Sequence, residues 1–253
     1  MIVALGLLLL PGHITAQSAS TGAIGSKVSV AFFANDEHDR PGSGITQADV
    51  AVLDNKRVPQ SIVGIGRRTD LPLRLGLLID TSNSERASGV YQAAVQAASA
   101  LYDALRLACD ERMKNDAVED SLRVIVVLSD GEDNQSRSSR SDAIASAQRA
   151  GVVIFAESTG YSPSRQTARG DRILKDITSE TGGLAFLTLS HKEVPRVFAT
   201  IKDQIDNMQL LSYVPVDPGP ADQYHSLELK PASTAKLRLR VPKGYYANLK
   251  PGS

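Results

Sequence analysis

Residues 75–80, Leu-Gly-Leu-Leu-Ile-Asp, decide the fold because an unbroken apolar run there ends in a carboxylate. Residues 124–131 repeat this arrangement as Val-Ile-Val-Val-Leu-Ser-Asp-Gly. Two further apolar runs follow at 152–156 and 184–187, and patterns of helical period fill the intervals. Buried runs that alternate with helices are typical of parallel strands covered on both faces. The sequence therefore predicts an α/β fold with a Rossmann-like open parallel sheet.

The regions on either side of this core have a different pattern. Residues 18–70 and 212–253 carry short runs of period two separated by Gly, Pro and charged turns. Each block offers only a few short strands, too few for independent stability. We therefore expect one small β module made from both blocks, beside a core at 71–211.

The first residues resemble a secretory signal peptide. Residues 1–10 read M-I-V-A-L-G-L-L-L-L, and Pro11, Gly12 and small residues follow. The pattern departs from a signal peptide in having no Lys or Arg before Lys27. We expect residues 1–17 to direct export to a periplasmic, cell-surface or extracellular location; the alternative is a buried strand or short helix.

Composition excludes several functions. The chain of 253 residues has 28 basic and 28 acidic side chains, and this balance argues against general nucleic-acid binding. No apolar run reaches the roughly 18 residues of a membrane-spanning helix, so no stable transmembrane helix is expected. The single cysteine, Cys109, falls on the apolar side of a predicted helix and is interpreted as a buried, inert thiol.

Polar oxygen donors follow the first core strand at alternate positions. Asp80, Ser82 and Ser84 form D-T-S-N-S directly after the apolar run, and Asp130 follows the next run. In open α/β sheets, ligands bind beyond the carboxyl ends of the strands. Carboxylate and hydroxyl oxygens suit Mg²⁺, Mn²⁺ or Ca²⁺ rather than zinc. These four residues are the predicted metal ligands.

The order of these motifs resembles a von Willebrand factor type A (VWA) domain. D-x-S-x-S, then V-V-L-S-D-G-E-D-N, A-Q-R-A-G-V-V-I-F-A and E-T-G-G-L-A-F all follow in sequence, and the chain is similar to the exported bacterial VWFA-related proteins known mostly from acidobacterial genomes. The flanking segments 45–62 and 243–247 match as well. The resemblance implies a metal-ion-dependent adhesion site (MIDAS), whose cation bridges to a carboxylate on a partner protein. It implies adhesion without catalysis.

The chain departs from this family between its first two core strands. The family has a threonine, usually in G-G-T, where this chain has Ser99 within A-A-S-A. Only 19 residues lead from Asp80 to Ser99, so a helix, two strands and another helix are missing. Apolar periodicity predicts one helix over residues 86–113 instead. Fifteen helical residues advance about 22 Å, which would remove Ser99 from the cation. We expect an incomplete site that binds Mg²⁺ or Mn²⁺ weakly.

Two other functions stay open at this stage. The chain could be a degenerate VWA-like scaffold without metal. It could also be a hydrolase, although no base–nucleophile pair is visible. An aspartyl-phosphate mechanism at Asp80 is disfavoured because position 82 is serine where such enzymes use D-x-D. The histidines outside the leader are interpreted as solvated surface residues: His38, His191 and His225.

Several other polar groups have ordinary structural interpretations. Glu132 and Asp133 are expected to lie in a solvated loop, and the serines at 136–141 to cap a helix over 142–150. Lys236, Arg238 and Arg240 share one face of a predicted strand. That face is interpreted as a charged edge, with a basic docking surface as the alternative.

Overall fold

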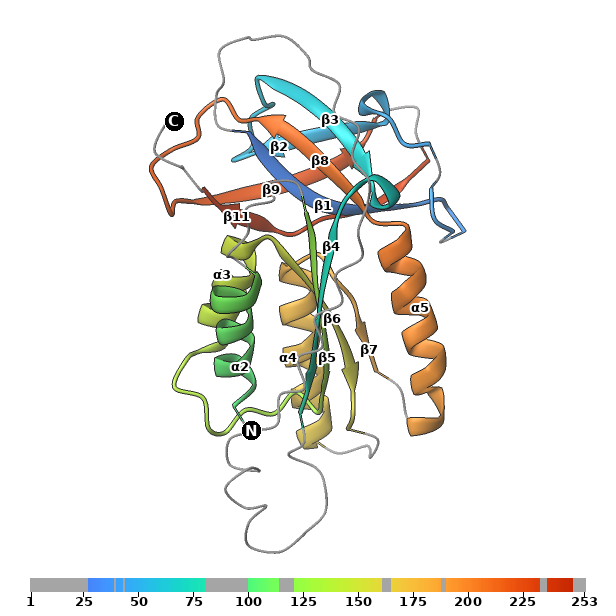
Figure 1. The fold of residues 1–253 in the computed structure, drawn as a ribbon, viewed down its shortest axis with the longest axis vertical. Coiled ribbons are helices and arrows are strands. Elements are labelled where there is room, and N and C mark those ends of the chain that lie inside the picture. The colour runs from blue at the N-terminus through green and yellow to red at the C-terminus, as the bar shows by residue number, and fades with distance from the viewer. Residues whose placement is uncertain are drawn as a thin grey trace, which may run out of the picture.

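The computed structural model describes residues 27–38, 40–42, 44–80, 100–113, 121–160, 165–187, 190–232 and 236–247 (Figure 1). The structure has two parts, a β sandwich and an α/β layer. A β sandwich contains strands from both ends of this range, and an α/β layer is inserted between β3 and β8. Among the described helices, none is long and apolar enough to cross a membrane.

The α/β layer contains a parallel sheet of four strands in the order β4-β5-β6-β7. Its strands are β4 (Leu73–Ile79), β5 (Leu122–Ser129), β6 (Val152–Ser158) and β7 (Ala185–Phe186). All three neighbouring pairs are parallel. The four apolar runs therefore form the predicted parallel sheet, and the predicted α/β class is confirmed. The last run contributes only two residues to the ladder.

Three helices cover one face of this sheet. Each right-handed crossover from β4 to β7 advances in the same direction, so the connecting helices must share a face. They are α2 (Leu101–Leu107), continued by the π-helical turn η3 (Ala108–Met113), then α3 (Arg140–Ala150) and α4 (Arg165–Glu180). Their apolar side chains pack with Leu78, Ile125 and Ile154. Helix α5 (Val194–Asp206), preceded by the short turn η4 (His191–Glu193), covers the opposite face (Figure 1).

Two details of these helices match the sequence interpretation. Cys109 is fully buried among α2, α3 and the sheet, and burial raises the pKa of its thiol to about 12, so it stays protonated and unreactive. The Ser139 hydroxyl accepts the backbone N–H of Asp142 and caps α3, which begins two residues before the expected 142.

The β sandwich packs two antiparallel sheets face to face. One has the order β10-β1-β8-β3 and the other β11-β9-β2. The strands of the first sheet are β1 (Val28–Asn35), β3 (Ser61–Arg67), β8 (Gln209–Val214) and β10 (Arg238–Arg240). Those of the second are β2 (Val50–Asp54), β9 (Tyr224–Pro231) and β11 (Gly244–Tyr246). Single 3-10 turns precede β2 and β4: η1 (Gln47–Asp49) and η2 (Arg68–Asp70).

Strand β1 is buried on both faces, which explains its nearly continuous apolar sequence. Val30 and Phe32 point into the sandwich, whereas Ala31 and Phe33 pack on the α/β layer beside Phe155. Strand β8 lies between β1 and β3 and spans residues 209–214, so it crosses the boundary expected at 211. The sandwich and the α/β layer therefore share a packed interface.

A buried polar network occupies the core of the sandwich, and it corrects the interpretation of His225 as a solvated residue. His225 is 1% exposed and its Nδ1 lies 2.8 Å from Oδ1 of Asp54. The hydroxyls of Tyr213 and Tyr245 donate to Oδ2 of Asp54, at 2.9 and 2.6 Å. A buried carboxylate is tolerated only when such donors surround it. His38 and His191 are exposed, as expected.

Arg240 joins the two layers, which also corrects the expectation of a solvated charged strand. Its guanidinium donates to the Gly182 carbonyl at 2.8 Å and to Gln204 Oε1 at 2.6 Å, and it lies 4.0 Å from the ring centroid of Phe33. Burial lowers the pKa of Arg240 to about 10. This value is still well above neutral pH, so the guanidinium stays charged. Neighbouring Arg238 and Lys236 remain exposed. The predicted common face therefore contains one arginine that is partly buried between the two layers.

Candidate cation-binding site

Asp80 and Ser129 meet at the carboxyl ends of β4 and β5. The Ser129 hydroxyl donates to Oδ2 of Asp80 at 2.7 Å, and the Asp80 backbone N–H donates to the Leu128 carbonyl at 2.8 Å. Ser129 is fully buried and Asp80 is half-buried. The parallel register that pairs Ile79 with Leu128 brings the two strand ends together. Asp80 therefore lies at the carboxyl end of β4, where the sequence placed it.

Asp130 follows Ser129 in a tight loop that helix α4 holds in place. Gly131 adopts φ +77° and donates its N–H to the Ser129 hydroxyl at 3.0 Å. The Glu132 N–H donates to Oδ1 of Asp130 at 3.0 Å. Gly170 of α4 packs so closely on the loop that a Cβ there would lie 1.9 Å from the Asp130 carbonyl oxygen. The backbone of the Asp130 loop is therefore held against α4, one residue after the serine that bonds Asp80.

Strand β6 ends in the same way as β5, although the sequence interpretation missed this. The Ser158 hydroxyl accepts the Gly160 N–H at 3.3 Å and donates to Oδ1 of Asp171 at 2.8 Å. Ser129 and Ser158 are paired in the sheet register. The sequence contains a motif that could have predicted this, because Ser-x-Gly follows both apolar runs, as S-D-G at 129–131 and S-T-G at 158–160. Each such serine orients a carboxylate at the same edge of the sheet.

Helix α2 begins at this edge, so the predicted continuous helix over 86–113 is wrong at Ala100. Ala100 has φ −109° and ψ 65°, outside the helical region, and Leu101 is the first helical residue. The first-turn N–H of Tyr102 donates to Oδ2 of Asp133 at 2.8 Å, and that of Asp103 to the Ser136 hydroxyl at 3.0 Å. Donors that a longer helix would bond internally are capped here by the β5–α3 loop.

The remaining predicted ligands lie outside the described residues: Ser82, Ser84 and Ser99. The start of α2 nevertheless changes the argument about Ser99. The distance of about 22 Å assumed uninterrupted helix from Ser84 to Ser99. Since Ala100 is not helical and α2 starts at the Asp133 loop, the assumption of one continuous helix does not hold at Ala100.

Asp133 lies in a loop, as expected, but it is half-buried there and caps helix α2. Besides the Tyr102 N–H, it accepts the Ser136 hydroxyl at 2.6 Å and the Ser136 N–H at 2.9 Å. In return, Asp103 accepts the backbone N–H groups of Arg137 and Ser138, both at 2.9 Å. These bonds fasten the first turn of α2 to the loop that carries Asp130.

Replacing Asp133 with alanine is expected to lower the free energy of unfolding by about 1–2 kcal/mol, because the first turn of α2 loses its cap. Urea denaturation followed by far-UV circular dichroism measures this change. Asp217→Ala, which removes one local bond to Gly219 in an exposed loop, is the control and should cost less. Equal stability of Asp133→Ala and the wild type would show that α2 does not depend on this cap.

The charges of this edge interact with one another. Partial burial raises the pKa of Glu132, repulsion from Asp130 raises it further, and Arg169 opposes both effects. Hydrogen bonds from the Ser138 side chain and from the backbone N–H groups of Arg137 and Ser138 lower the pKa of Asp103. The Asp103 contribution to stability is therefore present above the ordinary carboxyl pKa and lost as the pH falls through the folded value.

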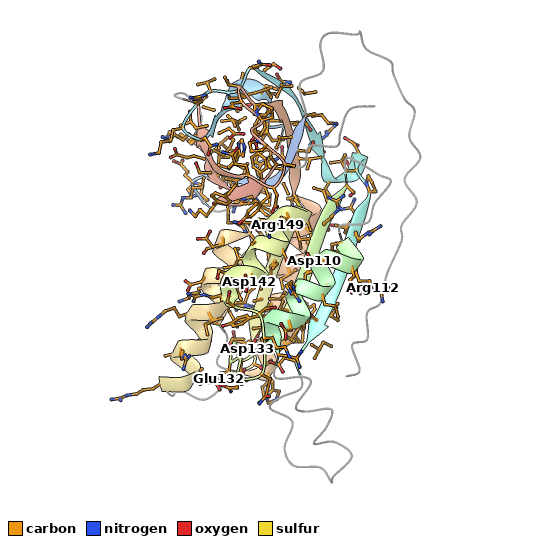
Figure 2. All side chains as sticks on the ribbon, turned by 90° about the vertical axis from the view of Figure 1, so that its left-hand side faces the viewer. Asp110, Arg112, Glu132, Asp133, Asp142 and Arg149 are labelled. Carbon is orange, nitrogen blue, oxygen red and sulfur yellow. The ribbon has the colours of Figure 1, made fainter. Side chains whose placement is uncertain are left out.

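The geometry places the site at the far end of the α/β layer from the sandwich. Figure 2 shows Glu132 and Asp133 at this end, whereas Arg149 lies beside the sandwich, where it contacts Asp222 and the ring of Tyr246. Among the described residues, no three or more His, Cys, Asp or Glu side chains are grouped to hold a metal ion. The described part of the donor set thus consists of Asp80 and Asp130, with Ser129 orienting the first.

Comparison of the chain with protein-family models, curated proteins and solved structures gives no match.

Proposed function

We propose that the chain is an exported, non-catalytic protein-binding module of VWA type, which contacts a carboxylate of its partner through a weakly bound divalent cation. The proposed ligands are Asp80, Ser82, Ser84 and Asp130, and Ser99 is a further candidate. The observation that carries the proposal is the pairing of β4 and β5, which puts Asp80 and the Asp130 loop at one edge of a parallel sheet.

The chemistry of the donors supports a hard cation. Asp80 and Asp130 supply carboxylate oxygens, and the proposed serines supply hydroxyl oxygens, without sulfur or imidazole. Mg²⁺ is bound in proteins by one or two carboxylates and retains several waters, so it needs few protein ligands. Ca²⁺ requires roughly six to eight oxygens and fits this set less well. We therefore propose Mg²⁺ or Mn²⁺ binding in the millimolar range, on the order of 4 kcal/mol.

The orientation of Asp80 supports the same interpretation. The buried Ser129 hydroxyl bonds Oδ2 and the strand pairing bonds the backbone N–H, and both contacts favour the observed orientation of the carboxylate. A ligand fixed in advance loses little side-chain entropy on binding. The contact of Gly170 with the Asp130 carbonyl fixes the second loop in the same way.

The decisive experiment is a titration of the purified chain with Mg²⁺ and Mn²⁺ by calorimetry. Asp80→Asn removes the charge but keeps an oxygen that can accept from Ser129, so the fold should be retained while cation affinity falls at least tenfold. Asp206→Asn is the matched control, because that carboxylate pairs with Lys202 on the exposed side of α5 and its replacement should leave affinity unchanged.

Each result of this titration has a clear meaning. Millimolar binding by the wild type that Asp80→Asn loses supports the proposal. Equal binding by the wild type and Asp80→Asn would place the cation elsewhere. Sub-micromolar affinity would show that a further ligand completes the site, with Ser99→Ala as the next variant to measure.

A further inference from the structure

Helix α4 exposes a face of three arginines. Arg165, Arg169 and Arg172 follow one another at intervals of four and three residues, which places them on one side of the helix over about 10 Å. All three are exposed. Within the described part of the chain they form no ion pair or hydrogen bond with another side chain. We call these three residues the arginine face.

The arginine face adjoins the candidate cation site. Gly170, the residue after Arg169, packs directly against the Asp130 carbonyl. The charge of Arg169 also acts on Glu132, in the loop that carries Asp130. Since α4 follows β6, its amino-terminal half lies at the same end of the sheet as the carboxyl end of β4 (Figure 1). Gly170 lies about 100° around the helix from Arg169 and further from Arg165 and Arg172, so the arginine face shares this end of the sheet with Asp80 but points away from the Asp130 loop.

The position of Arg165 is costly for the helix itself. The positive end of a helix dipole favours acidic side chains, yet the first turn of α4 has none and begins with Arg165. Arg165 weakens the helix slightly, by analogy with other charges placed against the dipole, whereas Arg169 and Arg172 lie beyond the first turn. Some other exposed basic side chains pair with acids, as Arg140 does with Asp176 and Lys202 with Asp206, whereas Lys192 and Arg196 form no ion pair with a described residue. Neither local stability nor ion pairing accounts for the arginine face.

We propose that the arginine face is a docking surface for an acidic segment of a partner protein. Guanidinium groups bind carboxylates through paired hydrogen bonds, so three of them fit a stretch rich in Asp and Glu. The proposal goes beyond the proposed function, because the arginines bind carboxylates of the segment whether or not a cation is held at Asp80. The chain as a whole has no basic surplus, which favours an acidic protein over a nucleic acid.

The test uses the full chain and a fluorescent peptide of alternating Glu and Ser, with the matching Gln–Ser peptide as the uncharged probe. Anisotropy is measured with Mg²⁺ and with EDTA. The variant replaces Arg165, Arg169 and Arg172 with glutamine. Its control replaces Arg57, Lys192 and Arg196, which are exposed and form no ion pair with a described residue, with glutamine, so both proteins lose the same charge.

We expect the acidic peptide to bind the wild type, and the arginine variant to bind it roughly tenfold more weakly, since each exposed charge pair contributes a factor of about two to five. The control should bind within twofold of the wild type. Mg²⁺ affinity measured by calorimetry should be unchanged in the arginine variant, because none of the three arginines is a cation ligand.

Three results would overturn the inference. The first is that the wild type does not bind the acidic peptide. The second is that the arginine variant and its control lose affinity for the peptide equally. The third is that a single-stranded oligonucleotide binds more tightly than the peptide at the same salt concentration. Failure of the proposed function is seen separately, as absence of Mg²⁺ binding. In that case the arginine-dependent part of peptide binding would still be measured in EDTA, and its presence there would support the docking surface.

Discussion

Asp54→Ala is expected to lower the free energy of unfolding by about 3–5 kcal/mol, the usual cost of removing one partner from a buried, hydrogen-bonded charge network. The carboxylate of Asp54 accepts from Tyr213 and Tyr245 and contacts Nδ1 of His225, all deep in the sandwich. Alanine would leave these three polar groups in the core without their common acceptor, and each would then pay its desolvation cost. Urea denaturation measures the change.

A graded control separates the network from simple loss of volume. Tyr213→Phe removes one donor and keeps the ring, and the Asp54 carboxylate retains its bonds to Tyr245 and His225. We expect it to cost about 1 kcal/mol. If Asp54→Ala cost no more than Tyr213→Phe, the carboxylate would not be the organising group of the sandwich core.

Gly170→Ala is expected to destabilise the chain by about 1–3 kcal/mol and to weaken Mg²⁺ binding as well. A Cβ at this position would lie 1.9 Å from the Asp130 carbonyl oxygen and 3.0 Å from its carbonyl carbon, so α4 or the Asp130 loop must move. Overpacking of this kind forces backbone shifts. Denaturation measures the first effect and calorimetric titration the second.

Gly64→Ala is the matched control, because no heavy atom lies within 4 Å of a Cβ built there. Its stability should stay the same or increase slightly, since alanine restricts the unfolded chain more than glycine does. A Gly170→Ala protein with wild-type stability and wild-type Mg²⁺ affinity would show that the Asp130 loop is not held by α4.

The parallel sheet was predictable because its signal is local. Each strand is an apolar run long enough to be buried on both faces, and the polar residue after it marks the carboxyl end. Asp80 and Asp130 could be placed at one edge for the same reason. The sequence also contained the repeated Ser-x-Gly at the ends of β5 and β6, so Ser129 could have been recognised as a residue that orients Asp80.

The errors arise where distant residues determine the structure. The sequence before Leu101 has good helical periodicity. Helix α2 nevertheless starts at Leu101, where Asp133 and Ser136, more than 30 positions away, cap its first turn. His225 looks like a surface residue on an alternating strand, yet its partner Asp54 is 171 positions away. Arg240 likewise finds its acceptors on α5 and after α4. No short-range pattern contains this information.

The insertion of the α/β layer between β3 and β8 has a consequence for the order of folding. Strand β3 pairs with β8 from Ser61↔Val214 to Arg67↔Gln209, so about 140 residues of chain lie between the two paired strands. Closing an unfolded loop of that length costs about 4 kcal/mol of chain entropy. Once the inserted layer has folded, it holds Leu73 and Asp206 within one compact body and removes most of that cost. The sandwich is therefore expected to assemble late, on a nucleus supplied by the inserted layer, and a chain that loses β8 would leave β1 and β3 without the strand that both of them need.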